Sequence, residues 1–122
     1  MNNSARALAM AAAILSLSAL VLAAMGSHLI DMKGMQDIWR TASVIHMFNA
    51  VALIGLAALL ASFQSRLLKW STWLIFSGTV IFCGSIYLHV ITGHIVPKVA
   101  PSGGLLMMAG WFLAVLSFLR KS

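Results

Sequence analysis

Four long apolar runs divide the chain, and short polar segments separate them. The runs cover approximately residues 5–25, 42–63, 70–92 and 102–119. A helix needs roughly 20 apolar residues to cross the hydrocarbon core of a bilayer, and each run supplies about that number. Apolar and polar residues do not alternate within the runs, which argues against membrane-spanning β-strands. The pattern predicts an all-α fold, in which residues 1–122 form one integral membrane bundle of four transmembrane helices.

The composition agrees with a membrane protein. Hydrophobic residues make up 61% of the chain and charged residues 8%, too few charges for the surface of a soluble domain. The formal net charge is +6, but the basic residues occur singly or in pairs between the apolar runs. Because they form no basic stripe, we expect membrane lipids and no nucleic acid as partners.

The first run has a competing interpretation. Arg6, followed by an Ala/Leu-rich stretch that ends in LAAMG, resembles a secretory signal peptide. The apolar stretch is, however, longer than the usual signal core of about 7–15 residues. We therefore expect residues 5–25 to stay in the protein as a true transmembrane helix.

The basic residues also predict an orientation. One side of the membrane would carry Arg6, Arg66, Lys69, Arg120 and Lys121, and the other Lys33, Arg40 and Lys98 with both acids, Asp31 and Asp37. Loops richer in Lys and Arg stay in the cytoplasm, so both termini are expected there. Trp39, Trp70 and Trp73 lie near the ends of runs, where indole rings favour the headgroup region.

Small residues at steps of three and four predict one close-packing face on each run. The face of the first run is Ala12, Ser16, Ala19, Ala23 and Gly26, and that of the second is Ala50, Ala57 and Ala61 beside His46 and Asn49. The face of the third run is Gly78, Ser85, His89 and Thr92, and that of the fourth is Gly103, Met107, Gly110, Ala114 and Ser117. Such faces predict a tight up-and-down bundle with little room for a pore.

Two of the connections carry structural signals. Residues 27–40, SHLIDMKGMQDIWR, are expected to lie on the membrane surface as a short amphipathic helix. Residues 93–102 contain Pro97 and Pro101, which predict a stiff loop, with Ser102 as the N-cap of the last helix.

Three stretches carry a resemblance to a known family. They are Gly26-Ser27-His28-Leu29, FCGSIYLHVITG at Phe82–Gly93, and Pro101–Trp111, which opens Pro-x-Gly-Gly-Leu-Leu and ends Ala-Gly-Trp. In these stretches the chain resembles the YgdD-like proteins, small four-span membrane proteins of bacteria with relatives in eukaryotic membranes. Such proteins tend to read Tyr-Gln-x-Tyr-His in the second helix, where this chain has Ile45-His46-Met47-Phe48-Asn49. The resemblance implies the fold and a location in the bacterial inner membrane, and no activity.

The up-and-down topology brings the histidines toward one side, the non-cytoplasmic one. The candidate binding residues there are His28, His46, Asn49, Tyr87 and His89, and His94 lies on the same side. The favoured interpretation is that His46, Asn49, Ser85, Tyr87 and His89 form hydrogen bonds between helices.

Other interpretations of these residues remain open. His and Met side chains suit copper or zinc, although no two histidines are spaced four apart on one helix. His46 and His89 on facing helices are alternatively suited to bind a haem as axial ligands. Lipid, quinone or partner contacts are further alternatives.

Catalytic chemistry is not expected. Asp31 and Asp37 lie in a polar connection next to basic residues, Cys83 lies within an apolar run, and no glycine-rich phosphate loop is present. We predict no enzyme activity, no metal site and no cofactor. The sequence favours a structural or accessory subunit that packs with itself, as a homo-oligomer, or with a larger membrane complex. The alternative is a membrane protein that handles a metal, haem or quinone through its outer-side histidines.

Overall fold

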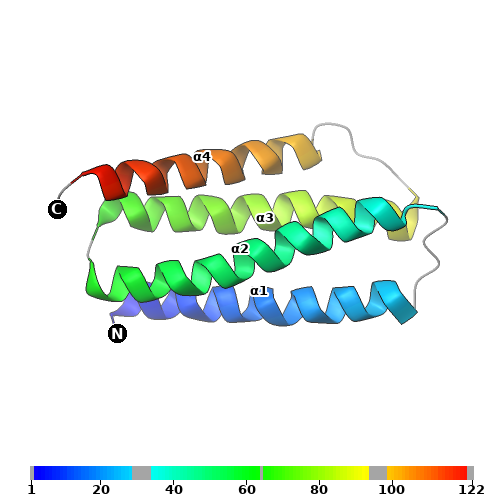
Figure 1. Ribbon diagram of the computed structural model, residues 1–122, viewed down its shortest axis with the longest axis horizontal. Coiled ribbons are helices and arrows are strands. Elements are labelled where there is room, and N and C mark those ends of the chain that lie inside the picture. Colours follow the sequence, from blue (N-terminus) through cyan, green and yellow to red (C-terminus); the bar gives the residue numbers. More distant parts are fainter. Residues whose placement is uncertain (1, 29–33, 64, 94–98, 121–122) are drawn as a thin grey trace.

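The computed structural model describes residues 2–28, 34–63, 65–93 and 99–120. Within these residues the chain forms four α-helices and no strand: α1 (Asn3–His28), α2 (Gln36–Ser62), α3 (Arg66–Thr92) and α4 (Val99–Leu119). Successive helices run in opposite directions (Figure 1). Each is long and apolar enough to cross a membrane. The predicted all-α membrane fold is confirmed, and the orientation with both termini in the cytoplasm stays a prediction.

The helices follow one another in space in the order of the sequence. α1 packs on α2, α2 on α3, and α3 most extensively on α4. Figure 1 shows α2 crossing obliquely over the neighbouring helices, and α1 and α4 at opposite edges. Among the described residues the backbones of α1 and α4 do not pack against each other. The fold is therefore more open than the tight bundle that the small residues predict.

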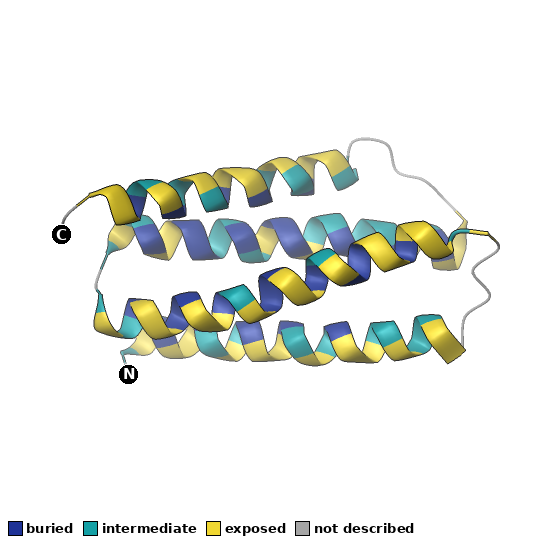
Figure 2. Ribbon diagram, viewed as in Figure 1, coloured by how far each residue is buried: buried dark blue, intermediate teal, exposed yellow. Residues whose placement is uncertain are grey.

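Much of each helix consequently faces outward. Buried residues make up 22% of the most apolar stretch of α1 and 39% of that of α2. Exposed residues run along the outer surface of every helix (Figure 2). Many of them are large and apolar, as expected for surfaces that contact lipid or another membrane protein.

Glycines set the close contact between α3 and α4. A Cβ added at Gly78 would lie 2.6 Å from the backbone nitrogen of Met107, and one at Gly110 would lie 2.8 Å from that of Ile75. The two backbones approach this closely because these positions lack a side chain. The predicted packing face of the last helix is confirmed, since its buried residues are Gly103, Met107, Gly110, Ala114 and Ser117.

The predicted packing face of the third helix is partly wrong. Gly78 is buried, but Ser85 and His89 are half-buried and Thr92 is exposed. Toward its C-terminus the helix instead buries Thr79, Cys83, Tyr87 and Val90. Both sets follow helical spacing, and the packing of α2 and α4 on α3 selects the second one.

Two expectations about the connections need correction. α2 begins at Gln36, so the last residues of the expected surface helix form its first turns, and residues 29–33 lie outside the described residues. α4 begins at Val99, so Ser102 lies inside its first turn. The Ser102 hydroxyl donates to the Val99 carbonyl at 2.8 Å and does not act as an N-cap. Residues 94–98 of the expected stiff loop are not described.

Candidate functional site

His46 lies at the centre of a buried hydrogen-bond network between α1, α2 and α3. Its Nε2 is 3.1 Å from Ser18 Oγ, and its Nδ1 is 3.0 Å from the Tyr87 hydroxyl. The Ser18 hydroxyl donates to the Leu15 carbonyl at 2.8 Å. A hydroxyl has one hydrogen, so Ser18 accepts from Nε2–H, and Nδ1 accepts from Tyr87. Both ring nitrogens of His46 are therefore engaged.

Asn49, one turn further along α2, organises a second network. Its amide nitrogen donates to Thr79 Oγ1 at 2.9 Å and to Met107 Sδ at 3.0 Å. Its amide oxygen accepts from Trp111 Nε1 at 3.1 Å. One buried side chain thus joins α2 to α3 and α4, and its donor and acceptor groups are both used.

Trp39 closes the end of the bundle next to His46. Its ring lies 4.6 Å from that of Tyr87, and its indole covers Gly26 of α1 so closely that a Cβ there would overlap it. Trp39 lies in the first turn of α2, near the end of the span as predicted, but it is 5% exposed, so its ring packs inside the protein. Within the described part of the chain, Trp39 Nε1 has no hydrogen-bond partner.

The other candidate histidines lie apart from this network. His28 is exposed at the end of α1, and His94 is outside the described residues. His89 is half-buried and lines a groove of about 560 Å³ between α3 and the start of α4, with Val80, Leu88 and Val99 among its apolar walls. The structure therefore joins His46 to Tyr87, and places His89 on a different side of α3.

Metal-ligating side chains do not gather in the part of the chain that the structure describes. No group of three His, Cys, Asp or Glu residues is found there in a position to hold an ion. The thiol of Cys83 is buried and donates to the Ala42 carbonyl at 3.3 Å. Cys83 thus takes part in the contact between α3 and α2.

Sequence reasoning missed three residues that complete the networks: Ser18, Thr79 and Trp111. Each places a polar group inside an apolar run, where burial without a hydrogen bond is costly. Trp111 carried the clearest signal, because it lies in the middle of α4 and away from the headgroup region. An indole N–H at that depth needs a partner inside the protein.

Comparisons with known proteins give consistent matches. The family model "Protein of unknown function (DUF423)" matches residues 22–104. A UPF0382 membrane protein of Staphylococcus haemolyticus is 32% identical over 98 residues, which cover 77% of this chain and 80% of the relative. The UPF0382 membrane protein YwdK of Bacillus subtilis is 32% identical over 114 residues, 88% of this chain and 92% of the relative.

The UPF0382 inner membrane protein YgdD of Escherichia coli is 30% identical over 113 residues, which cover 89% of this chain and 86% of the relative. No solved structure matches. The names of these relatives agree with the membrane-spanning helices of the structure. The predicted location in the bacterial inner membrane is thereby confirmed.

Proposed function

Since the chain belongs to the DUF423 family of membrane proteins, whose function is unknown, we propose that it is a structural or accessory subunit of the inner membrane. It packs with itself or with a larger membrane complex, and it has no catalytic activity and no cofactor of its own. The observation that carries this proposal is the use of His46 and Asn49 in hydrogen bonds between helices.

These hydrogen bonds use the side-chain nitrogen and oxygen atoms of His46 and Asn49 that catalysis or metal binding would require. A general base or a metal ligand requires a lone pair that faces the substrate or the ion. His46 uses both ring nitrogens on Ser18 and Tyr87, and Asn49 uses its amide on α3 and α4. Any other partner would have to break contacts between helices, which supports a packing role for both residues.

The outer surface supports packing with another membrane protein. Gly55 and Gly84 lie inside helices, yet beyond the adjacent residues and backbone of their own helix no atom of the described residues lies within 4 Å of a Cβ added at either position. Glycine in a helix interior costs up to about 1 kcal/mol relative to alanine, and the internal packing of this chain does not require it here. Small residues on the outside of a span do allow a helix of another chain to approach closely.

Native mass spectrometry of the protein extracted in mild detergent, together with crosslinking in native membranes, tests this proposal. The proposal predicts a homo-oligomer or a larger complex. Gly55→Leu should release a monomer, because the larger side chain blocks the close approach of a helix from another chain. The monomer should stay folded, because the new side chain meets open space within its own chain. Val51→Leu, at a position of α2 that is 67% exposed, is the matched control and should keep the assembly. A bare monomer without crosslinked neighbours would rule the proposal out.

A second candidate function is the binding of a lipid-soluble quinone in the groove at His89. The His89 imidazole makes no hydrogen bond to the described residues, and it lies in a largely apolar groove. Such a group can donate to a quinone carbonyl. The geometry favours this ligand over haem or metal at His46, whose nitrogens are both engaged.

Quinone extraction from the purified protein distinguishes this candidate from the first. The quinone function predicts bound quinone in the wild type, its loss in His89→Leu and its retention in His28→Leu, since His28 is exposed at the end of α1. Equal quinone content in wild type and His89→Leu would reject it.

A further inference from the structure

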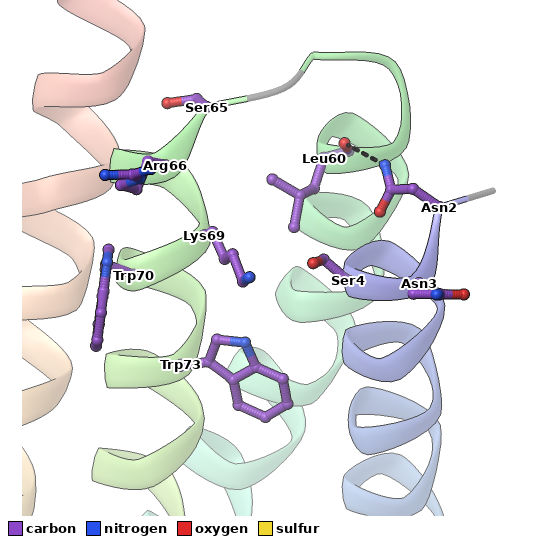
Figure 3. Close-up of a pocket in the computed structure, with 9 residues that line it drawn as sticks. All are labelled: Asn2, Asn3, Ser4, Leu60, Ser65, Arg66, Lys69, Trp70 and Trp73. Carbon is purple, nitrogen blue, oxygen red and sulfur yellow. Dashed lines mark hydrogen bonds between the residues drawn. The ribbon is translucent and has the colours of Figure 1, made fainter.

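A pocket of about 770 Å³, lined by polar, basic and aromatic residues, lies at the end of the molecule where α1 and α3 begin and α2 ends. Its walls include Asn2 and Ser4 of the α1 end, Leu60 of α2, and Arg66, Lys69 and Trp73 of α3 (Figure 3). Neither hydrogen-bond network of His46 or Asn49 extends to these residues. The pocket is therefore separate from the candidate site already described.

The pocket is electropositive. Arg66 and Lys69 are both exposed and form no ion pair with any side chain that the structure describes. Asp37, the acidic side chain among the described residues, lies in the first turn of α2 at the other end of the molecule. Neither α1 nor α3 has an acidic residue in its first turn, so the positive ends of two helix dipoles add to the two cations, while the negative end of the α2 dipole at Ser62 offsets part of this charge.

Hydrogen bonds within the chain hold one wall of the pocket, the start of α1, in place. Asn2 donates to the Leu60 carbonyl at 3.4 Å and accepts from the Ala5 backbone N–H at 2.7 Å, which fixes the start of α1 against α2. Lys69 extends from α3 toward Ser4 of α1, beside the Trp73 indole (Figure 3). The wall formed by the start of α1 is therefore in place before any ligand binds, which lowers part of the entropy cost of binding.

The pocket is expected to lie at the border between the hydrocarbon core and the headgroup region of the membrane. It lies at the ends of helices that are able to span a bilayer, and Trp70 at its rim is 62% exposed. Indole rings favour the headgroup region, so we expect Trp70 to lie near the depth of the lipid phosphates. Basic pockets between transmembrane helices at this depth are typical sites for anionic lipid headgroups.

We propose that this pocket binds the phosphate-bearing headgroup of an anionic phospholipid. Lys69 donates a charge-assisted hydrogen bond to the phosphate oxygens, and the hydroxyl of Ser4 adds a neutral donor. Arg66, which Figure 3 shows on the Trp70 side of α3, adds its positive charge at the rim. Leu60 and Trp73 provide apolar contact for the glycerol end of the acyl chains. The occupant is a lipid and not free phosphate, because the rim of the pocket and the outer surfaces of the helices contact lipid molecules. This inference goes beyond the proposed function and does not depend on it.

A lipid titration followed by native mass spectrometry tests the proposal on the full-length protein. Phosphatidylglycerol is the anionic probe, and phosphatidylcholine is the zwitterionic one. Each basic residue near a lipid phosphate contributes about fivefold in affinity, so Arg66→Gln combined with Lys69→Gln should weaken phosphatidylglycerol binding roughly 30-fold. Phosphatidylcholine carries the same phosphate but a compensating choline cation, so it should bind more weakly to the wild type and lose less affinity in the double variant.

Arg6→Gln combined with Arg120→Gln is the matched control. It removes the same charge from the same end of the molecule, but neither residue lines the pocket. The control should keep most of the phosphatidylglycerol affinity. Equal losses in both double variants would overturn the proposal in favour of general charge attraction, and an unchanged affinity of the pocket variant would also overturn it.

Competition with inorganic phosphate distinguishes a site for a lipid headgroup from a site for free phosphate. The proposal predicts that millimolar phosphate leaves phosphatidylglycerol bound, whereas complete displacement would show a free-phosphate site and overturn the lipid assignment. Circular dichroism checks that each variant is folded. Should the pocket double variant not fold, Lys69→Gln alone decides the same question, with an expected loss of about fivefold.

Discussion

The indole N–H of Trp111 donates to the amide oxygen of Asn49 at 3.1 Å and thereby joins α4 to α2. Among the described residues, the backbones of these two helices do not pack directly on each other. The same amide also reaches Thr79 of α3. A single side chain in the middle of the membrane thus connects three helices.

The first prediction concerns the coupling between Asn49 and Trp111. In a double-mutant cycle of Asn49→Ala and Trp111→Phe, the coupling free energy should be about 0.6 kcal/mol and at most about 1.7 kcal/mol, the range for hydrogen bonds between membrane helices. Asn49→Ala alone should lower the free energy of unfolding by about 1–3 kcal/mol, because it leaves the Trp111 N–H unpaired. Unfolding in mixed detergent micelles measures both values.

Trp70→Phe is the control for this cycle. Trp70 is 62% exposed, so its substitution should change the free energy of unfolding by less than about 0.5 kcal/mol. A coupling of zero between Asn49 and Trp111 would show that the hydrogen bond does not stabilise the fold.

The second prediction concerns the tautomer of His46. Because Ser18 donates to the Leu15 carbonyl, the proton of the neutral ring should sit on Nε2. Nitrogen-15 NMR of the histidine side chain should show a protonated Nε2 and an unprotonated Nδ1. Tyr87→Phe should keep this tautomer and shift the Nδ1 resonance, since it removes the donor to Nδ1.

Ser85→Ala is the control for the tautomer experiment. The Ser85 hydroxyl donates to the Phe82 carbonyl of its own helix, so its loss should leave the His46 resonances unchanged. A proton on Nδ1 would contradict the network as described.

The sequence predicted the packing face of α4 but not all of that of α3, for a physical reason. α4 has one set of small residues at helical spacing, so its inward face was unambiguous. On α3, Tyr87 and His89 are both polar but lie two residues apart, which places them on different sides of the helix. The packing of neighbouring helices, which the sequence does not reveal, turned Tyr87 inward and His89 toward the groove.

Contacts between distant parts of the chain were the least predictable. The topology placed His46 and Tyr87 at one end, but the pairing of His46 with Ser18 depends on how far α1 is shifted along α2. The pocket at the other end of the molecule, lined by Arg66 and Lys69, also could not be predicted from the sequence. Counting basic residues placed Arg66 and Lys69 on one side, whereas their shared cavity with the start of α1 required the three-dimensional arrangement.

The third prediction concerns the only cysteine of the chain. Cys83 is 2% exposed, and its thiol donates to the Ala42 carbonyl of α2. A maleimide should therefore modify it only as fast as the protein opens. A cysteine introduced by Ser62→Cys, at the exposed end of α2, should react at the rate of a free thiol in a Cys83→Ser background. Fast labelling of Cys83 in the folded protein would contradict its burial between α2 and α3.

The fourth prediction compares two glycines of α3. Gly78→Ala should lower the free energy of unfolding by about 1–3 kcal/mol, because its methyl group meets the backbone of α4 and forces the helices apart. Gly84→Ala, six residues further along the same helix, places its methyl group in open space. It should leave the stability unchanged or raise it by up to about 1 kcal/mol through helix propensity. Denaturation of both variants in the same detergent measures the difference, and equal effects would mean that Gly78 does not set the distance between α3 and α4.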